Sequence, residues 1–135
     1  MNAFKYEYLD KETFERVASS VRQWVGRKGY LRPQSSLTFV SRDLGWNKKY
    51  VSHVVNREYG LPFPHFVNRL RVNHLKDMLQ ESESARDLKI SYLCRVAGFS
   101  TYGKFSFTIR RMYNMSPREF ISILAQDPLA SSFQQ

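Results

Sequence analysis

The chain has 135 residues, and its 42% hydrophobic content allows a buried core and argues against disorder overall. Its formal net charge of +9 favours an anionic partner, either a nucleic acid or an acidic membrane surface. No apolar run approaches the ~18 residues of a membrane span, the N-terminus lacks the apolar core of a signal peptide, and one cysteine excludes an internal disulfide. We therefore expect a cytoplasmic protein that makes no membrane contact.

Apolar residues recur at helical spacing along the chain, which predicts an all-α fold. A first helix is expected over residues 11–28, ended by Gly26 and Gly29. Residues 30–33 are expected to be extended, because a residue before proline avoids the helical region.

A helical hairpin is predicted next. Residues 37–44 form a two-turn helix that Gly45 stops. Asn47 is a good N-cap for a second helix over residues 48–59, and Gly60 suits the left-handed residue that closes it.

The longest helix is predicted over residues 64–80, with Pro64 in the first turn. Its buried stripe is expected to consist of apolar residues at helical spacing: Phe66, Val67, Leu70, Leu75, Met78 and Leu79. Its polar and charged residues are expected mostly elsewhere around the helix: Arg69, Arg71, Asn73, Lys76 and Asp77. Residues 81–87 are polar and read as a loop.

A second hairpin follows. A short helix with an apolar face begins near Ile90 and is stopped by Gly98. Ser100 is expected to cap the next helix, which runs to about Tyr113, and Asn114 takes the left-handed position after it. A capping box then opens a last helix with three residues: Ser116, Pro117 and Glu119.

The sequence of a glycine, an aromatic residue and a polar cap therefore occurs twice, each time between a short apolar helix and a longer basic one. Gly45 and Gly98 are 53 residues apart, whereas Gly60 and Asn114 are 54 apart, so the second turn carries about one extra residue. This pattern is typical of a helix-turn-helix. Two copies predict a protein that contacts two stretches of DNA groove.

The predicted organisation has five parts: an N-terminal helix and linker (1–35), a first helix-turn-helix (36–62), a connecting helix and loop (63–87), a second helix-turn-helix with a C-terminal helix (88–126), and a flexible tail (127–135).

In a helix-turn-helix, one stripe of the second helix packs inward and the opposite stripe enters the major groove. The inward stripe of the first copy is apolar: Val51, Val54, Val55 and Tyr59. The outward stripe carries groups that can hydrogen-bond to base edges: Lys49, Ser52, His53 and Asn56. Lys48 and Arg57 flank this stripe and suit phosphates. The alternative is an ordinary solvated helix face.

The inward stripe of the second copy is Phe105, Thr108, Ile109 and Met112. Its outward stripe has fewer hydrogen-bonding groups: Thr101, Tyr102, Gly103, Ser106, Phe107 and Arg110. Gly103 lets backbone approach backbone. Phe107 suits either apolar contact with a thymine methyl group or packing against the rest of the protein. Thr101, Arg110 and Arg111 are the phosphate candidates here.

The sequence predicts neither a metal site nor a catalytic centre. His65 and His74 are expected on different faces of one helix, and His53 is expected on a different helix. Cys94 is expected in the core. No Gly-rich phosphate loop, nucleophile elbow or paired carboxylates occur, so we expect a non-enzyme without a cofactor.

These residues resemble a known family. Gly98-Phe99-Ser100 and Asn114-Met115-Ser116-Pro117 are similar to the motif of AraC/XylS-type transcription regulators, as are residues 105–106 and 109–111. Further similar segments lie in the first copy and the long helix: residues 50–52, 57–60, 66–71 and 78–79. The resemblance covers about residues 36–122. It implies a C-terminal DNA-binding domain whose two recognition helices enter successive major grooves of double-stranded DNA.

The resemblance also implies base-reading residues, which are Lys49, Ser52 and His53 in the first helix and Tyr102, Gly103, Ser106 and Phe107 in the second. The chain departs from the family at five positions: His53 and Phe107, where arginine is frequent, Leu75 and Cys94, where a small residue is usual, and Asn114, where glycine is usual. Because Phe107 cannot hydrogen-bond to a base, we expect the first helix to carry more of the sequence specificity.

Residues 14–33 resemble the segment that precedes this domain in AraC-type regulators of gut Bacteroidota, which often carry a large upstream sensor. The chain is expected to be either a standalone short regulator or the terminal piece of a longer one, and the candidate partners are an upstream sensor domain and RNA polymerase. Two other functions stay open: a protein-interaction module that uses the helix-turn-helix as a scaffold, with Tyr102, Gly103 and Phe107 as its docking patch, and an enzyme acting on nucleic acid.

Overall fold

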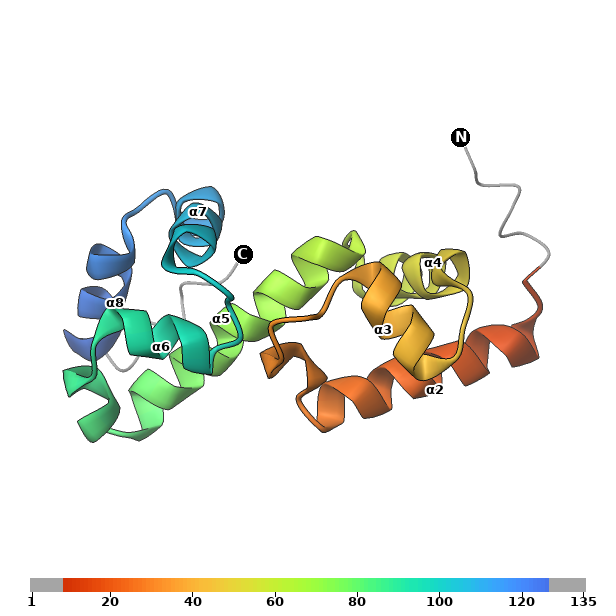
Figure 1. The fold of residues 1–135 in the computed structure, drawn as a ribbon, viewed down its shortest axis with the longest axis horizontal. Helices are drawn as coiled ribbons and strands as arrows, with labels where there is room; N and C mark the ends of the chain where they lie inside the picture. The colour runs from red at the N-terminus through yellow and green to blue at the C-terminus, as the bar shows by residue number, and fades with distance from the viewer. Residues whose placement is uncertain (1–8, 127–135) are drawn as a thin grey trace. The chain divides into compact units, whose positions relative to one another are not determined.

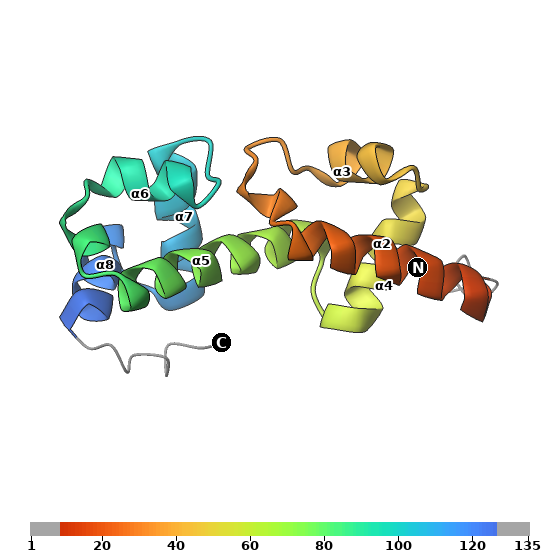
Figure 2. The same cartoon turned by 90° about the horizontal axis from the view of Figure 1, so that it is seen from below.

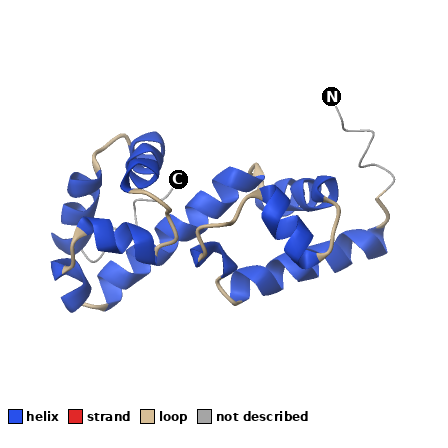
Figure 3. Cartoon of the chain, viewed as in Figure 1, coloured by secondary structure: helices blue, strands red, loops and turns tan. Residues whose placement is uncertain are grey.

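A computed structural model describes residues 9–126 of the chain. Within that range every regular element is helical (Figure 3), which confirms the predicted all-α fold. The α-helices are α2 (Lys11–Gly26), α3 (Leu37–Leu44), α4 (Lys48–Tyr59), α5 (Phe63–Glu81), α6 (Ile90–Val96), α7 (Tyr102–Tyr113) and α8 (Pro117–Gln126) (Figure 1). There are also two short 3-10 helices: η1 (Gly29–Leu31) lies between α2 and α3, and η2 (Ser84–Asp87) lies between α5 and α6. The predicted tail from residue 127 lies outside the described residues.

The chain divides into two compact units within α5, between Arg69 and Leu70. Unit 1 contains α2, α3, α4 and the first turns of α5. Unit 2 contains the rest of α5 with α6, α7 and α8. Each unit therefore holds one of the two predicted hairpins.

In unit 1, α2 packs along α4 and buries four residues against it and its neighbours: Val17, Ala18, Val21 and Trp24. Asp10 caps α2, since its Oδ1 accepts a hydrogen bond from the Thr13 amide at 2.7 Å. The Trp24 indole lies 6.0 Å from the Phe63 ring and 6.2 Å from the Tyr30 ring. Gly29 passes so close to this indole that any side chain there would collide with it.

In unit 2, α6, α7 and α8 surround the C-terminal part of α5 (Figure 2). The core they share is built from large side chains: Leu75, Leu79, Leu93, Phe99, Phe105, Ile109, Phe120 and Leu124. Cys94 is 1% exposed, which confirms its place in this core. The predicted capping box opens α8, with Ser116 and Glu119 exchanging backbone-to-side-chain hydrogen bonds at 2.9 and 3.1 Å.

The helices predicted over residues 37–44 and 48–59 are found at those bounds. Elsewhere the bounds differ. The first helix ends at Gly26 rather than residue 28. In the stretch predicted to be extended, Tyr30 and Leu31 belong to η1, whereas Arg32, before Pro33, is extended as predicted. The long helix begins one residue before Pro64 and runs to Glu81, so the loop predicted from residue 81 begins later and contains η2. Short 3-10 turns are frequent near the ends of α-helices, and hydrophobic periodicity does not detect them.

Three burial predictions were wrong. Arg71 and Lys76, expected away from the buried stripe of α5, are each 8% exposed. A long aliphatic stem allows such a side chain to be largely buried, and the Arg71 guanidinium lies 5.5 Å from the centre of the Phe99 ring. Burial lowers the pKa of Arg71 to about 10, which still leaves it protonated at neutral pH. Tyr59, expected in the core, is 39% exposed and instead stacks on Phe66.

Candidate nucleic-acid interface

The turn of the first hairpin is fixed by its backbone. Gly45 ends α3 with φ of 80°, a left-handed conformation that strains any other residue type. The Trp46 amide then donates to the Ser41 carbonyl at 3.0 Å. Asn47 caps α4 as predicted, because its side-chain oxygen accepts from the Lys49 amide at 2.7 Å. The turn thus directs α4 away from α3 with two residues between glycine and helix.

The turn of the second hairpin is one residue longer, as the spacing predicted. Gly98 has φ of 101°, and three residues separate it from Tyr102, the first residue of α7. The N-cap is Thr101, whose Oγ1 accepts from the Lys104 amide at 3.1 Å. The prediction that Ser100 is the cap was therefore wrong by one residue, since the extra residue of this turn precedes the cap. Asn114 closes α7 in the predicted left-handed conformation, with φ of 56°.

The two second helices correspond residue by residue. Val51, Val54 and Val55 form the buried stripe of α4, and Phe105, Thr108 and Ile109 occupy the same register in α7. The outer stripes therefore also correspond, in the pairs Lys49 and Gly103, Ser52 and Ser106, His53 and Phe107, Asn56 and Arg110, and Arg57 and Arg111.

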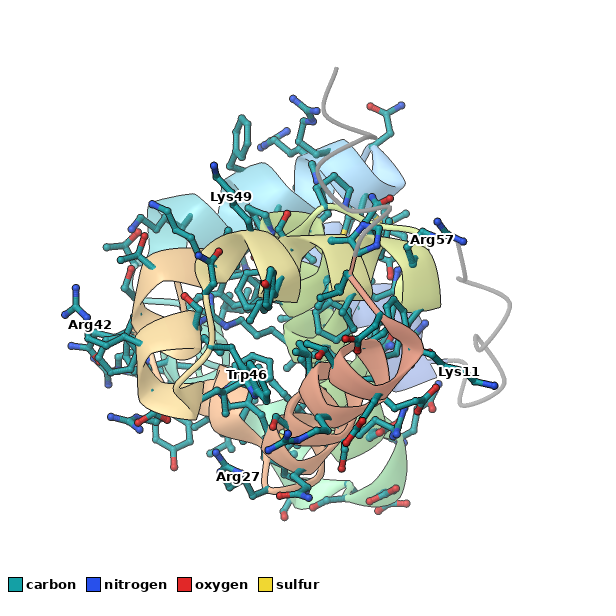
Figure 4. The ribbon with its side chains drawn as sticks, turned by 90° about the vertical axis from the view of Figure 1, so that its right-hand side faces the viewer. Lys11, Arg27, Arg42, Trp46, Lys49 and Arg57 are labelled. Atoms are coloured by element: carbon teal, nitrogen blue, oxygen red, sulfur yellow. The ribbon has the colours of Figure 1, made fainter. Side chains whose placement is uncertain are left out.

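The outer face of α4 brings most of its predicted residues to solvent. Lys48, Lys49, Asn56 and Arg57 are exposed, whereas Ser52 and His53 are half-buried. Lys49 and Arg57 project outward from α4, while Trp46 lies between the turn and α2 (Figure 4). No carboxylate of residues 9–126 forms an ion pair with Lys48 or Lys49, so both ammonium groups remain available to an anion.

His53 has a neighbour that sequence periodicity missed. Its ring meets that of Phe14 in α2 edge-to-face, with the ring centres 6.0 Å apart and the planes at 85°. Burial, and secondly the charge of Arg57, lower the pKa of His53, so its imidazole is neutral at physiological pH. The signal for this contact was present in the sequence, because Phe14 falls on the apolar stripe of residues 11–28. The stripe alone does not indicate which helix it packs against.

The outer face of α7 is aromatic at one end and cationic at the other. Tyr102 is 47% exposed and Phe107 is 63% exposed, so the Phe107 ring does not belong to the core of unit 2. The Arg111 guanidinium lies 5.6 Å from the centre of that ring. A Cβ atom added at Gly103 would meet only the Thr101 hydroxyl, at 3.9 Å, which leaves open space beside the helix. Thr101 and Arg110 are exposed, and Ser106 is half-buried.

Between residues 9 and 126, no three His, Cys, Asp or Glu side chains lie close enough together to hold a metal ion. Helices long and apolar enough to cross a membrane are absent from that same stretch. Burial raises the pKa of the Cys94 thiol, which opposes a reactive thiolate.

Two hairpins, each with a capped second helix that exposes polar and basic groups opposite its buried stripe, define a protein of the helix-turn-helix class. The model of the family described as "Helix-turn-helix domain" matches residues 40–122, more than half of the chain. The chain belongs to this family, in its AraC type.

Relatives and solved structures agree with this assignment. An uncharacterized HTH-type transcriptional regulator of Staphylococcus aureus strain MSSA476 is 27% identical over 86 residues, which are 63% of this chain but only 11% of that protein. The chain therefore spans about a ninth of the length of the curated relatives it matches.

Solved structures of other proteins share the fold. The C-terminal domain of AraT, a response regulator from Geobacillus stearothermophilus, has a TM-score of 0.65 at 20% identity, over 79% of this chain and 84% of its own. A transcriptional regulator from Chromobacterium violaceum, described as containing an AraC-type DNA-binding domain, has a TM-score of 0.61 at 21% identity, over 81% of this chain and 95% of its own.

Proposed function

We propose that this chain is the DNA-binding part of a transcription regulator, and that it binds double-stranded DNA by placing α4 and α7 in successive major grooves. The observation that carries this proposal is the residue-by-residue correspondence of the two hairpins, both of which leave a cationic helix face without carboxylate partners among the described residues. A net charge of +9 supplies the attraction to phosphates.

The outer stripe of α4 is proposed to read bases. Lys49 can donate to guanine O6 and N7, and the amide of Asn56 can pair bidentately with adenine. Neutral His53 offers one donor and one acceptor. Ser52, half-buried beside them, can donate to or accept from either kind of base edge. Lys48 and Arg57 flank the stripe and are proposed to contact phosphates.

The outer face of α7 is proposed to work differently. Tyr102 and Phe107 present apolar rings to the groove, where the thymine methyl group is the matching feature of a base pair. Gly103 allows close approach, and Ser106 supplies one hydrogen-bonding group. Thr101, Arg110 and Arg111 are proposed to hold phosphates, so α7 adds affinity and shape readout more than hydrogen-bonded specificity.

Selection of bound sequences from a random duplex DNA pool tests this function. Two preferred blocks about 10–10.5 base pairs apart are expected, because two helices on one DNA face are separated by one helical turn. A single block would show that only one helix selects sequence. Absence of binding at low salt would reject the proposal.

Absence of DNA binding at low salt would favour a second function, docking of a protein, which is supported by the exposure of Tyr102 and Phe107. The hairpins would then be a scaffold that docks a protein, such as an upstream sensor domain or RNA polymerase, through this aromatic face. We further propose that the protein acts in the cytoplasm and is not an enzyme. Incubation of the chain with plasmid and Mg²⁺ tests the second point, since the DNA should stay uncut.

A further inference from the structure

Helix α2 lies outside the residues that the family model matches, yet it packs along the first hairpin, and polar and aromatic side chains add to this packing. At the turn, the Trp46 indole donates from Nε1 to the Ser20 hydroxyl at 3.0 Å, and Arg16 lies 5.9 Å from the centre of that ring. At the end of α4, Arg22 pairs with Glu58 at 3.2 Å. A third contact falls on a residue of the outer stripe of α4, His53.

This third contact is the edge-to-face meeting of Phe14 with His53. It leaves His53 half-buried, whereas Phe107, at the corresponding position of α7, is 63% exposed. An imidazole on an open helix face samples several rotamers and loses that freedom when it binds a base. An aromatic pair of this kind shifts such an equilibrium roughly 2- to 12-fold toward one orientation.

We propose that Phe14 is a positioning residue for DNA recognition: it holds the His53 ring in one orientation on α4, so that α2 forms part of the reading surface. This inference rests on the proposed function. It assigns to residues before the matched domain a role in choosing the base pair that His53 contacts. The buried stripe of α2 packs this helix along α4 and so keeps Phe14 beside His53; its residues are Val17, Ala18, Val21 and Trp24.

The test uses the full chain and a random-sequence duplex DNA pool. Bound sequences are selected with the unaltered protein, and the base pair assigned to His53 is the one whose preference is lost in His53→Ala. Binding of Phe14→Leu is then measured on duplexes that differ only at that base pair. Arg22→Ala is the matched control, since it removes another contact between α2 and α4 that does not involve the imidazole.

If Phe14 positions His53, discrimination at that base pair falls from roughly tenfold to less than about threefold in Phe14→Leu, while affinity for unselected DNA is unchanged. Phe14→Tyr restores it, because the ring is kept. In nuclear magnetic resonance spectra, the His53 ring protons lose the ring-current shift of Phe14 in the leucine variant. Arg22→Ala keeps both the discrimination and the shift.

Equal discrimination by Phe14→Leu and the unaltered chain overturns the inference while leaving the proposed function intact. Loss of binding to all DNA in Phe14→Leu, with circular dichroism unchanged, also overturns it, since a positioning residue affects one base pair. Failure of the unaltered chain to bind duplex DNA at low salt instead rejects the proposed function, and the inference with it.

Discussion

The outer face of α4 carries Lys49, His53 and Asn56, whereas the corresponding face of α7 carries Gly103 and Phe107 at the first two of these positions. The backbones beneath them are alike, since each helix has a polar N-cap, three buried residues in the same register and a left-handed residue at its end. The comparison shows which features maintain the hairpin. Caps, glycines and the buried stripe determine it, so the outer face is free to acquire different chemistry in each copy.

The largest difference between the two copies is expected in their cores, in the free energy of unfolding lost when a buried side chain is truncated. Phe105→Ala in α7 should lower the free energy of unfolding by about 3–5 kcal/mol, because a fully buried ring leaves a large cavity. Val51→Ala, at the corresponding position of α4, removes only two methyl groups and should cost about 2 kcal/mol. Urea denaturation followed by circular dichroism measures both.

The two tryptophans, Trp24 and Trp46, lie in unit 1, so their fluorescence reports on that unit. In Phe105→Ala, the fluorescence midpoint should move less than the circular dichroism midpoint. Equal shifts of both midpoints would show that the two units unfold together, so that the stability of each core cannot be compared separately.

The outer faces give the next largest effect. Lys49→Ala or His53→Ala should weaken binding to a selected site by about 1–3 kcal/mol and binding to random DNA very little, because base contacts carry the sequence preference. Ser106→Ala, on α7, should cost less at the same site. Gel-shift titration on both DNAs measures the difference. An equal loss on selected and random DNA would contradict base reading by α4.

The residues that close the two helices differ as well. Gly60 has φ of 73° and Asn114 has φ of 56°, so both are left-handed. Gly60→Ala should lower the free energy of unfolding by about 1–2 kcal/mol, the cost of this conformation for a residue with a Cβ atom. Asn114→Gly should leave stability equal or slightly higher. Thermal unfolding compares the two, and a loss of stability in Asn114→Gly would mean that the asparagine side chain itself contributes.

The phosphate contacts should be alike in the two copies. Arg57→Ala and Arg110→Ala are each expected to reduce the slope of log affinity against log salt by about 0.9, the value for one phosphate neutralised. Arg27→Ala is the matched control, because Arg27 lies on the side of unit 1 away from Lys49 (Figure 4). A slope that changes equally in all three variants would assign the effect to net charge alone.

A feature of the fold could be predicted from the sequence when the residues that determine it lie close together along the chain. The bounds of α3 and α4, the Asn47 cap and the left-handed Asn114 follow from residues within one or two turns, and the sequence predicted them. The burial of Arg71 and the exposure of Tyr59 depend on which surfaces meet in three dimensions. Periodicity identifies the apolar face of a helix but not its partner.

The same limit applies to the candidate site. The outer stripe of α4 was predicted from its spacing, and Lys49 and Asn56 are exposed as expected. The contact between His53 and Phe14 joins residues far apart in the chain and needs the packing of α2 on α4 to be known. The base and phosphate roles of these residues stay predictions.

The smallest effect expected is a pH dependence confined to the first copy, because α7 has phenylalanine where α4 has His53. Burial and then the charge of Arg57 lower the pKa of His53 in the folded state below its ordinary value of about 6.5. Between the two values the unfolded chain binds more protons. The free energy of unfolding contributed by His53 is therefore present above about pH 6.5 and is lost as the pH falls through the folded pKa.

DNA binding should depend on pH in the opposite direction, since phosphates near α4 favour the charged imidazole and raise the pKa of His53. Acidification from about pH 7 to about pH 5.5 should thus destabilise the free protein slightly and strengthen its binding to DNA. His53→Gln keeps a hydrogen-bonding side chain without a titrating group, so the difference between the two pH profiles isolates His53. If the unaltered chain and His53→Gln have the same pH profile for DNA binding, bound DNA does not change the pKa of His53, and the imidazole lies away from the phosphates.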